Sequence, residues 1–250
     1  NGRNILILVT VTLVITIFNK ALVNAAKDII KIPGVESVGI SKNRDVKNVG
    51  IFGDEVEILE GKQSIQEGIN EIKYDLKAKA FYQLNPEQAI KLYKEVKSHL
   101  DFTKDKVIVD AYCGSGAIST YLAPHAEKIL GIDINKESIY SARHNKKINE
   151  FNNIDFEIGE VKDILPMFYK KNFNPDVIII DPPRSGIDDR TLDVLNRKVI
   201  DKIIYISCNP STLGKNINVL KRNYKIESMR ALDMFPHTSQ IESITVLKKK

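Results

Sequence analysis

The chain has 250 residues, of which 43% are hydrophobic and 28% charged, a composition that excludes an intrinsically disordered protein. Its 37 Lys and Arg against 32 Asp and Glu leave a formal net charge of +5, which is compatible with a polyanionic partner but does not require one. The sequence has only two cysteines, Cys113 and Cys208, and no Cys/His cluster. This argues against a disulfide scaffold, an iron–sulfur cluster and a metal site, and a cytoplasmic location is expected.

The most apolar segment, residues 5–18, is rich in Val, Ile and Thr and is predicted to be a buried strand. It is shorter than the roughly 20 residues that span a membrane. It also lacks the basic flank and cleavage site of a signal peptide, so no membrane role is expected. The sequence begins with Asn1 rather than Met, which leads us to expect a longer natural chain.

Residues 1–80 are predicted to form a small α/β domain. A helix is expected over residues 20–31, because its apolar side chains fall on one helical face. A second helix, over residues 86–100 with Pro86 in its first turn, belongs to the following domain. The further strands expected in the small domain are residues 35–40, 56–59, 64–69 and 72–76.

Residues 81–250 are predicted to form a second α/β domain of alternating strands and helices. Near-continuous apolar strands joined by helices predict a parallel sheet covered on both faces. Only a loop separates the last two strands, so these two are expected to pair antiparallel. The expected strands are residues 107–111, 129–132, 154–158, 177–180, 203–206, 226–232 and 241–247, and the clearest helices are residues 136–149 and 212–220.

A glycine-rich turn, DAYCGSG over residues 110–116, follows the strand 107–111. Glycines such as Gly114 let the backbone approach a ligand closely where a helix begins. Asp133 ends the next strand, where a carboxylate accepts hydrogen bonds from ribose hydroxyls. The third glycine of the dinucleotide motif is absent, and Thr120 stands near the position where it would fall. The loop therefore need not bind a pyrophosphate, which fits S-adenosylmethionine, a nucleoside without phosphate.

These cofactor residues have structural alternatives. The glycine turn can end a strand without any ligand, and Asp133 can be the N-cap of the helix that follows it. Glu160, after the third strand, either reaches the adenine end of the cofactor or lies solvated on a helix.

Three further segments fall where strands meet the ligand-binding edge of such a sheet. They are DPPRSG over residues 181–186, SCNP over residues 207–210, and the segment 233–242 that enters the last strand. Because that strand is antiparallel, its start lies at the edge where the parallel strands end. Asp181, Cys208 and Glu242 are therefore expected to converge.

Together with FYQLN over residues 81–85, these segments resemble the RNA uracil-5-methyltransferase family, which makes 5-methyluridine in tRNA and 23S ribosomal RNA. The resemblance covers residues 70–250 closely and the first seventy loosely. It implies a Rossmann-like class I methyltransferase domain over residues 81–250, preceded by a smaller domain, residues 1–80, that contacts RNA. The resemblance makes Cys208 the nucleophile and Glu242 the proton acceptor, and it assigns S-adenosylmethionine to Gln83, Tyr112, Asp133 and Asp181.

The chemistry requires these residue types. Carbon 5 of uracil is a weak nucleophile until a thiolate adds to carbon 6, and a base must afterwards remove the carbon 5 proton. Cys208 and Glu242 supply the thiol and the base. Arg184, with Asp181, is placed to hydrogen-bond the uracil ring, and RNA phosphate is an alternative partner for Arg184. The reacting base must also leave its stack.

Other readings of these residues remain open. Cys113 is expected to be a small buried apolar side chain, and His237 a hydrogen-bonding loop residue rather than a base. Glu242 could be a surface carboxylate, and Gln83 could cap the helix at Pro86. A methyltransferase acting on amino groups of adenine or glutamine is disfavoured, because it needs an aromatic residue at position 184 and no thiol. An RNA-binding or ribosome-assembly module with secondary methylation is the other rival.

Three departures from the family stand out. Many members carry an N-terminal oligonucleotide-binding barrel that these residues do not supply, and some carry four cluster-binding cysteines. Gln240 stands where histidine is common, two residues before Glu242. The motifs do not identify the RNA; 23S ribosomal RNA is favoured and tRNA second. A monomer is expected.

Overall fold

The computed structural model describes residues 9–43, 52–53, 55–69, 71–76, 85–100, 106–238 and 240–250. The chain divides into two compact units. The first comprises residues 1–68 and 73–80, and the second residues 69–72 and 81–250. Within the described ranges, no helix has the length and apolarity that a transmembrane span needs.

The first unit is built on a three-stranded sheet in the order β1-β2-β3. The strands β1 and β2 pair in parallel, whereas β3 runs antiparallel to β2. The predicted helix and strands of this region are confirmed. The elements are β1 (Val9–Ile15), α1 (Ala21–Ile29), β2 (Val35–Lys42) and β3 (Val56–Gly61), followed by the two-stranded sheet of β4 (Ile65–Ile69) and β5 (Ile72–Leu76).

The prediction that the first strand is buried is wrong. Every residue of β1 keeps some exposure, and the side chains of Val9 and Val14 are 39% and 42% exposed. The reason is that β1 lies at the edge of its sheet, whereas β2 lies between two neighbours and buries Val38 and Ile40 almost completely. The apolar composition of a strand does not reveal whether it is an edge or a central strand.

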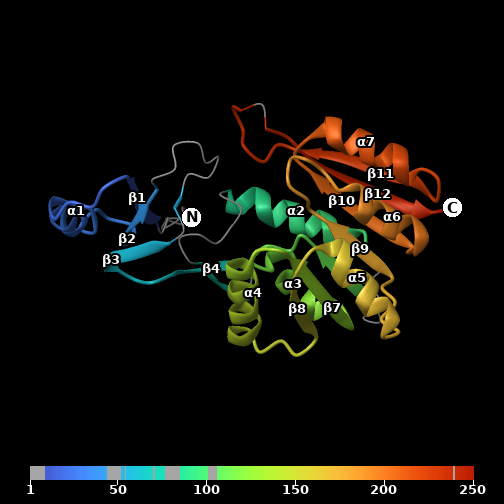
Figure 1. The fold of residues 1–250 in the computed structure, drawn as a ribbon, viewed down its shortest axis with the longest axis horizontal. Coiled ribbons are helices and arrows are strands. Elements are labelled where there is room, and N and C mark those ends of the chain that lie inside the picture. Colours follow the sequence, from blue (N-terminus) through green and yellow to red (C-terminus); the bar gives the residue numbers. More distant parts are fainter. Residues whose placement is uncertain are drawn as a thin grey trace, which may run out of the picture. The chain divides into compact units, whose positions relative to one another are not determined.

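The second unit is built on a seven-stranded sheet in the order β11-β12-β10-β9-β6-β7-β8 (Figure 1). Five of these strands are parallel, and β12 runs antiparallel to both of its neighbours. The predicted parallel sheet and terminal antiparallel pair are thus confirmed. The strands are β6 (Val107–Ala111), β7 (Lys128–Asp133), β8 (Ile154–Ile158), β9 (Val177–Ile180), β10 (Lys202–Ser207), β11 (Tyr224–Leu232) and β12 (Glu242–Lys249).

Helices cover both faces of this sheet. On one face, Leu165, Leu195 and Leu213 pack in a single buried cluster with alternate strand residues such as Val109 and Ile178. These leucines come from the helices α5 (Val161–Lys170), α6 (Asp189–Arg197) and α7 (Pro210–Leu220). The helices α2 (Pro86–Ser98) and α4 (Lys136–Ile148) both contact α3 (Ala117–Leu122).

Two helix starts follow from their capping residues. Asn85 accepts a hydrogen bond from the amide of Gln88 and precedes Pro86 at the first position of α2. Asn135 accepts one from the amide of Ser138 at the start of α4. The alternative roles of Asp133 and Gln83 as helix caps are therefore not observed. Asp133 lies two residues before the cap of α4, and the cap of α2 is Asn85, while Gln83 itself lies outside the described residues.

The insertion of β12 between β10 and β11 brings distant parts of the chain together. The register pairs Ser207, the last residue of β10, with Ser243, the second residue of β12. The Ser243 hydroxyl donates to the Ser207 carbonyl at 3.1 Å. The carboxyl end of β10 and the start of β12 therefore lie at the same edge of the sheet, as predicted.

Candidate active site

The glycine turn between β6 and α3 is held in conformations that favour glycine. Gly114 and Gly116 have φ values of 53° and 73°. A Cβ on Gly116 would lie 2.6 Å from the ring of Phe156, whereas a Cβ on Gly114 would meet no atom within 4 Å. Tyr112, just before the turn, has a φ of 63°, which is strained for a bulky residue. The turn therefore packs closely at Gly116 and is open at Gly114.

Asp133 fixes the open side of this turn. One carboxylate oxygen accepts the Gly114 amide at 2.9 Å, and the other accepts the Asn135 amide at 2.8 Å. Each oxygen has a second lone pair, so the carboxylate can still accept hydroxyl donors. Thr120 donates its hydroxyl to the Gly116 carbonyl at 2.6 Å and thus closes the first turn of α3 rather than contacting the loop from outside.

Asp110 is a buried carboxyl beside the turn with one oxygen left over. Its Oδ2 accepts the Ser119 hydroxyl at 2.6 Å and the Ser119 amide at 3.1 Å. Its Oδ1 is buried and has no hydrogen-bond partner within the described part of the chain. Burial raises the pKa of Asp110 to about 7, and the neighbouring Asp133 charge adds to this effect. A buried acceptor without a partner marks this edge as a place for a donor or a cation.

The register of the sheet brings the predicted thiol and base side by side. Cys208 follows Ser207 and Glu242 precedes Ser243, so the two residues flank the last paired position of β10 and β12. Directly opposed residues on antiparallel strands have Cα atoms only about 4.5–5.5 Å apart. Asp181 follows β9, whose Ile180 pairs with Tyr205 of β10. The three side chains thus come from three adjacent strands at one edge.

The charges of these groups act on one another. Burial raises the pKa of Asp181 to about 8, with further contributions from Glu242 and Asp110. Burial, then Glu242 and Asp181, raise the pKa of the Cys208 thiol, while Arg184 lowers it. The pKa of Glu242 is likewise raised by burial and lowered by Arg184. Arg184 is therefore the positive charge that favours ionisation of both groups.

Arg184 is tied to this edge at two points. Its guanidinium donates to the side-chain oxygen of Gln240 at 2.7 Å. Its carbonyl accepts the Asn209 side-chain amide at 3.0 Å and the Thr212 hydroxyl at 3.3 Å. No pattern in the sequence predicts the Arg184–Gln240 contact, because 56 positions separate these two polar side chains, which lie in irregular segments.

The other predicted site residues lie in different settings. Tyr112 packs against the core, and burial raises the pKa of its hydroxyl to about 12, with Thr191 and Asp188 beside it. Glu160 is the N-cap residue of α5, but its side chain makes no capping hydrogen bond and instead forms an ion pair with Lys162. The thiol of Cys113 faces β7, where a Cβ on Gly131 would come within 3.0 Å of it.

Gln83 lies outside the described residues. His237, in the loop before β12, is exposed and has a φ of 74°. Both cysteines of the chain are free thiols.

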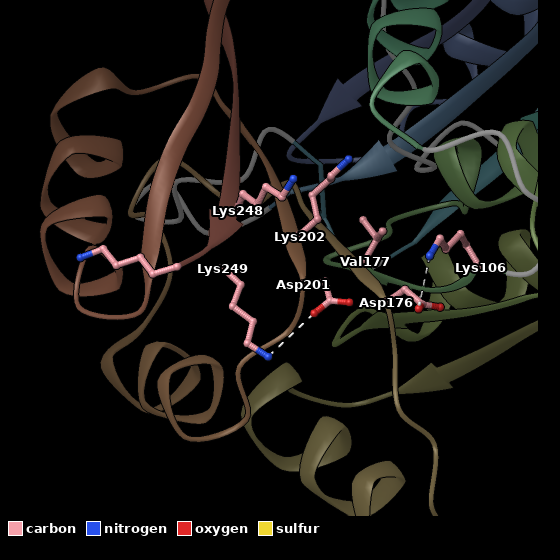
Figure 2. Close-up of a pocket in the computed structure, with 8 residues that line it drawn as sticks. Lys106, Asp176, Val177, Asp201, Lys202, Lys248 and Lys249 are labelled. Carbon is pink, nitrogen blue, oxygen red and sulfur yellow. Dashed lines mark ion pairs between the residues drawn. The ribbon is translucent and has the colours of Figure 1, made fainter.

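A second charged region lies at the opposite edge of the sheet, where β6, β9 and β10 begin (Figure 2). It is a hollow of about 310 Å³. Lys106 pairs with Asp176 at 3.6 Å and Lys249 with Asp201 at 3.9 Å, and Lys202 donates to the His99 carbonyl at 2.7 Å. The residues that line it are Lys106, Asp176, Val177, Asp201, Lys202, Lys248, Lys249 and Lys250.

Solved structures identify the class of protein that this fold defines. The chain is similar to a tRNA (uracil-54, C5)-methyltransferase of Pyrococcus abyssi, solved in complex with S-adenosyl-L-homocysteine, with a TM-score of 0.72 and 32% identity. The match covers 85% of this chain and 50% of that one. Trm5b from the same organism matches with a TM-score of 0.62 at 18% identity, over 98% and 73% of the two chains, which is a likeness of fold alone. The second unit thus has the class I methyltransferase fold.

Sequence comparison then gives the family. The model of the tRNA (uracil-5-)-methyltransferase family matches residues 54–250, so the chain belongs to this family. An uncharacterized RNA methyltransferase of Listeria innocua is 41% identical over 219 residues, which are 88% of this chain and 48% of that protein. One of Streptococcus pneumoniae is 40% identical over 230 residues, 92% and 51% of the two chains. The chain therefore spans about half the length of the relatives that it matches.

Proposed function

We propose that this chain is the catalytic part of an S-adenosylmethionine-dependent methyltransferase that methylates carbon 5 of a uridine in RNA. Its family membership supports the class of reaction. The observation that carries the proposal is the pairing of Ser207 with Ser243, which sets Cys208 against Glu242 at the ligand-binding edge of the sheet. A thiol beside a general base is the pair that this reaction needs.

The residues around the glycine turn fit the cofactor. S-adenosylmethionine is a cation that supplies an electrophilic methyl group when bound. The open space at Gly114 leaves room for a nucleoside, and the Asp133 carboxylate has lone pairs for its ribose hydroxyls. The unpartnered Oδ1 of Asp110 can face a donor or a cation, and a cation bound at this edge would lower the raised pKa of Asp181. Gln83 and Tyr112 remain proposed cofactor contacts, as does Glu160, for which the ion pair with Lys162 is the competing role.

The thiol begins the reaction. The Cys208 thiolate forms a bond to carbon 6 of uracil, and the electrons of the ring double bond move toward carbon 5 and the carbonyl oxygen. Arg184, which lowers the pKa of the thiol, favours the thiolate and can also hydrogen-bond the developing oxyanion. Carbon 5 of the uracil would then use that electron pair to bond the methyl group, and the carbon–sulfur bond that breaks would leave the methyl donor as a neutral thioether.

The base completes the reaction. Glu242 removes the proton that carbon 5 still carries, and the electrons of that bond restore the ring double bond. The bond between carbon 6 and sulfur breaks, and the sulfur leaves as the thiolate of Cys208. Burial raises the pKa of Glu242, which makes the carboxylate a stronger base than a solvated one. Each turnover therefore regenerates the thiolate and leaves a proton on Glu242 for release to solvent.

The RNA target is the least specified part of the proposal. The sequence favours 23S ribosomal RNA, whereas tRNA is the RNA in the names of the family and of the Pyrococcus abyssi structure. We propose a uridine exposed in a loop, because the base must leave its stack to reach the thiol. The free thiols Cys113 and Cys208 favour a cytoplasmic location.

The test uses RNA transcribed with 5-fluorouridine, in two arms, a tRNA and a 23S ribosomal RNA fragment. Fluorine at carbon 5 is not removed as a proton, so the reaction stops at the covalent adduct. We expect a band on a denaturing gel that requires S-adenosylmethionine, is absent in Cys208→Ala and persists in Cys113→Ala, the matched cysteine control. Absence of the band in both arms, although calorimetry shows cofactor binding, would contradict the proposal.

A further inference from the structure

Arg184 is hydrogen-bonded both to the segment that carries Cys208 and to the segment that carries Glu242. Its carbonyl accepts the side-chain amide of Asn209, the residue directly after Cys208. Its guanidinium donates to Gln240, two residues before Glu242. One end of Arg184 is thus fixed to the segment that carries the thiol, and the other end to the segment that carries the base.

The other titratable groups around the Cys208 thiol are acidic. Asp181 after β9, Glu242 on β12 and Tyr205 on β10 are the other titratable groups that act on or respond to Cys208. Among the charged side chains that act on the thiol, Arg184 is the one that lowers its pKa, and a backbone hydrogen bond to Cys208 acts in the same direction. The position of the Arg184 guanidinium therefore affects how much thiolate is present.

We propose that Gln240 is a positioning residue: its side-chain oxygen keeps the Arg184 guanidinium beside Cys208 and Glu242, so that the thiolate can form. That this thiol attacks uracil rests on the proposed function, whereas the hold on Arg184 does not. No other described residue accepts a hydrogen bond from the Arg184 guanidinium. Arg184 is exposed, so loss of this bond would free the side chain to move into solvent.

The loop prepares Gln240 for this task. The Gln240 amide donates to the Thr238 hydroxyl at 3.1 Å, and that hydroxyl donates to the Phe235 carbonyl at 2.8 Å. A glutamine oxygen accepts from a guanidinium without neutralising its charge, which a carboxylate at this position would do. The amide also does not titrate. The histidine common here in the family can accept only while it is neutral, so the glutamine makes the hold on Arg184 independent of pH.

The test is a titration of the thiol itself. The rate of Cys208 alkylation by iodoacetamide is measured against pH, with mass spectrometry of the Cys208 peptide, in the wild-type protein and in Gln240→Ala. We expect alkylation near neutral pH to slow by roughly three- to tenfold, which is a rise of about half to one unit in the thiol pKa. Gln66→Ala, at an exposed glutamine on β4, is the matched control and should titrate as the wild type.

Two further variants separate positioning from general damage. Arg184→Ala should slow alkylation at least as much as Gln240→Ala does. The double variant should be no slower than Arg184→Ala, because each change removes the same guanidinium charge from beside the thiol. Gln240→His should restore most of the rate above about pH 7.5, where the imidazole is neutral and accepts the hydrogen bond. Gln240→Ala titrating as the wild type, or adding fully to Arg184→Ala, would overturn the inference.

The two proposals fail in different ways. A shifted thiol titration without any RNA adduct would contradict the proposed function and leave the role of Gln240 standing. An adduct in the wild type with an unshifted titration in Gln240→Ala would do the reverse. With a competent RNA, Gln240→Ala should also move the rising limb of the kcat profile to higher pH, whereas a structural defect would lower kcat at every pH.

Discussion

The two edges of the seven-stranded sheet carry charge in opposite ways. At the edge where the parallel strands end, Asp110, Asp181 and Glu242 all have raised pKa values, and Arg184 is the cation that acts on the thiol and on Glu242. At the other edge, lysines lie beside aspartates and form ion pairs (Figure 2). Like charges held together in a buried place destabilise the fold, so their presence indicates chemistry rather than structure.

The largest effect should come from removing the base. In Glu242→Gln, the thiol can still add to uracil and carbon 5 can still be methylated, but the carbon 5 proton is not removed. Turnover should fall by about 10²- to 10⁴-fold, and a methylated covalent adduct with ordinary uridine RNA should accumulate, because general bases contribute rate factors of this size. Adduct on denaturing gels and single-turnover methyl transfer are the measurements.

The control for this experiment is Glu227→Gln, at a glutamate of β11 that pairs with Lys248 toward the opposite edge. It should turn over as the wild type. Full turnover by Glu242→Gln would show that another group removes the proton. The carboxylate at this edge would then have no more chemical importance than Glu227 near the other edge.

A large effect on stability should follow from Asp110→Asn. Because burial raises the pKa of Asp110 to about 7, the wild-type fold favours the protonated acid. The stability that this provides is complete below the unfolded pKa of about 4 and is lost as the pH rises through about 7. Asparagine does not titrate, so the free energy of unfolding of the variant should not fall over this pH range. In the wild type the fall is up to about 4 kcal/mol, for a shift of three pKa units.

Urea unfolding of both proteins between pH 4 and pH 8 measures this difference. Asp176→Asn is the comparison at the opposite edge. Asp176 pairs with Lys106 and accepts the Val107 amide at 2.8 Å, so its removal should not reproduce the gain at high pH. Parallel stability curves for Asp110→Asn and the wild type would show that Asp110 is ionised within the fold.

The smallest effect should come from the lysine hollow. Replacing Lys248 and Lys249 by alanine removes two long, half-exposed ion pairs, of 3.8 and 3.9 Å. Such pairs contribute about 0–1 kcal/mol each, so the unfolding free energy should change by no more than this. KM for RNA and its dependence on salt should stay as in the wild type. A marked rise in KM at low salt would instead reveal an RNA contact at this edge.

Local patterns in the sequence predicted most of the second unit. The predicted bounds of β6, β8 and β9 match the observed ones. The central strand β9 is apolar throughout because it is buried on both faces, whereas β8, at the edge of the sheet, alternates apolar residues with Asp155 and Glu157. The pattern of α5 predicts a helix less clearly, since Pro166 lies inside this helix. The edge position of β1 could not be predicted, because pairing partners are set by contacts far apart in sequence.

The site shows the same division. Convergence of Cys208 and Glu242 followed from strand direction alone, because antiparallel strands bring an end and a start to one edge. The unpartnered oxygen of Asp110 and the contact between Arg184 and Gln240 did not, since both depend on side-chain positions that no local spacing fixes. Gln240 was visible in the sequence only as a departure from a family pattern.

The position of β12 has a consequence for how the protein is made. This strand is the last of the sheet in chain order, yet it lies between β10 and β11. Until it is in place, β10 and β11 lack the partner that joins them, and Glu242 does not yet lie beside Cys208. A nascent chain that has already formed its glycine turn therefore still lacks the proposed pair of thiol and base, which only the step that closes the sheet brings together.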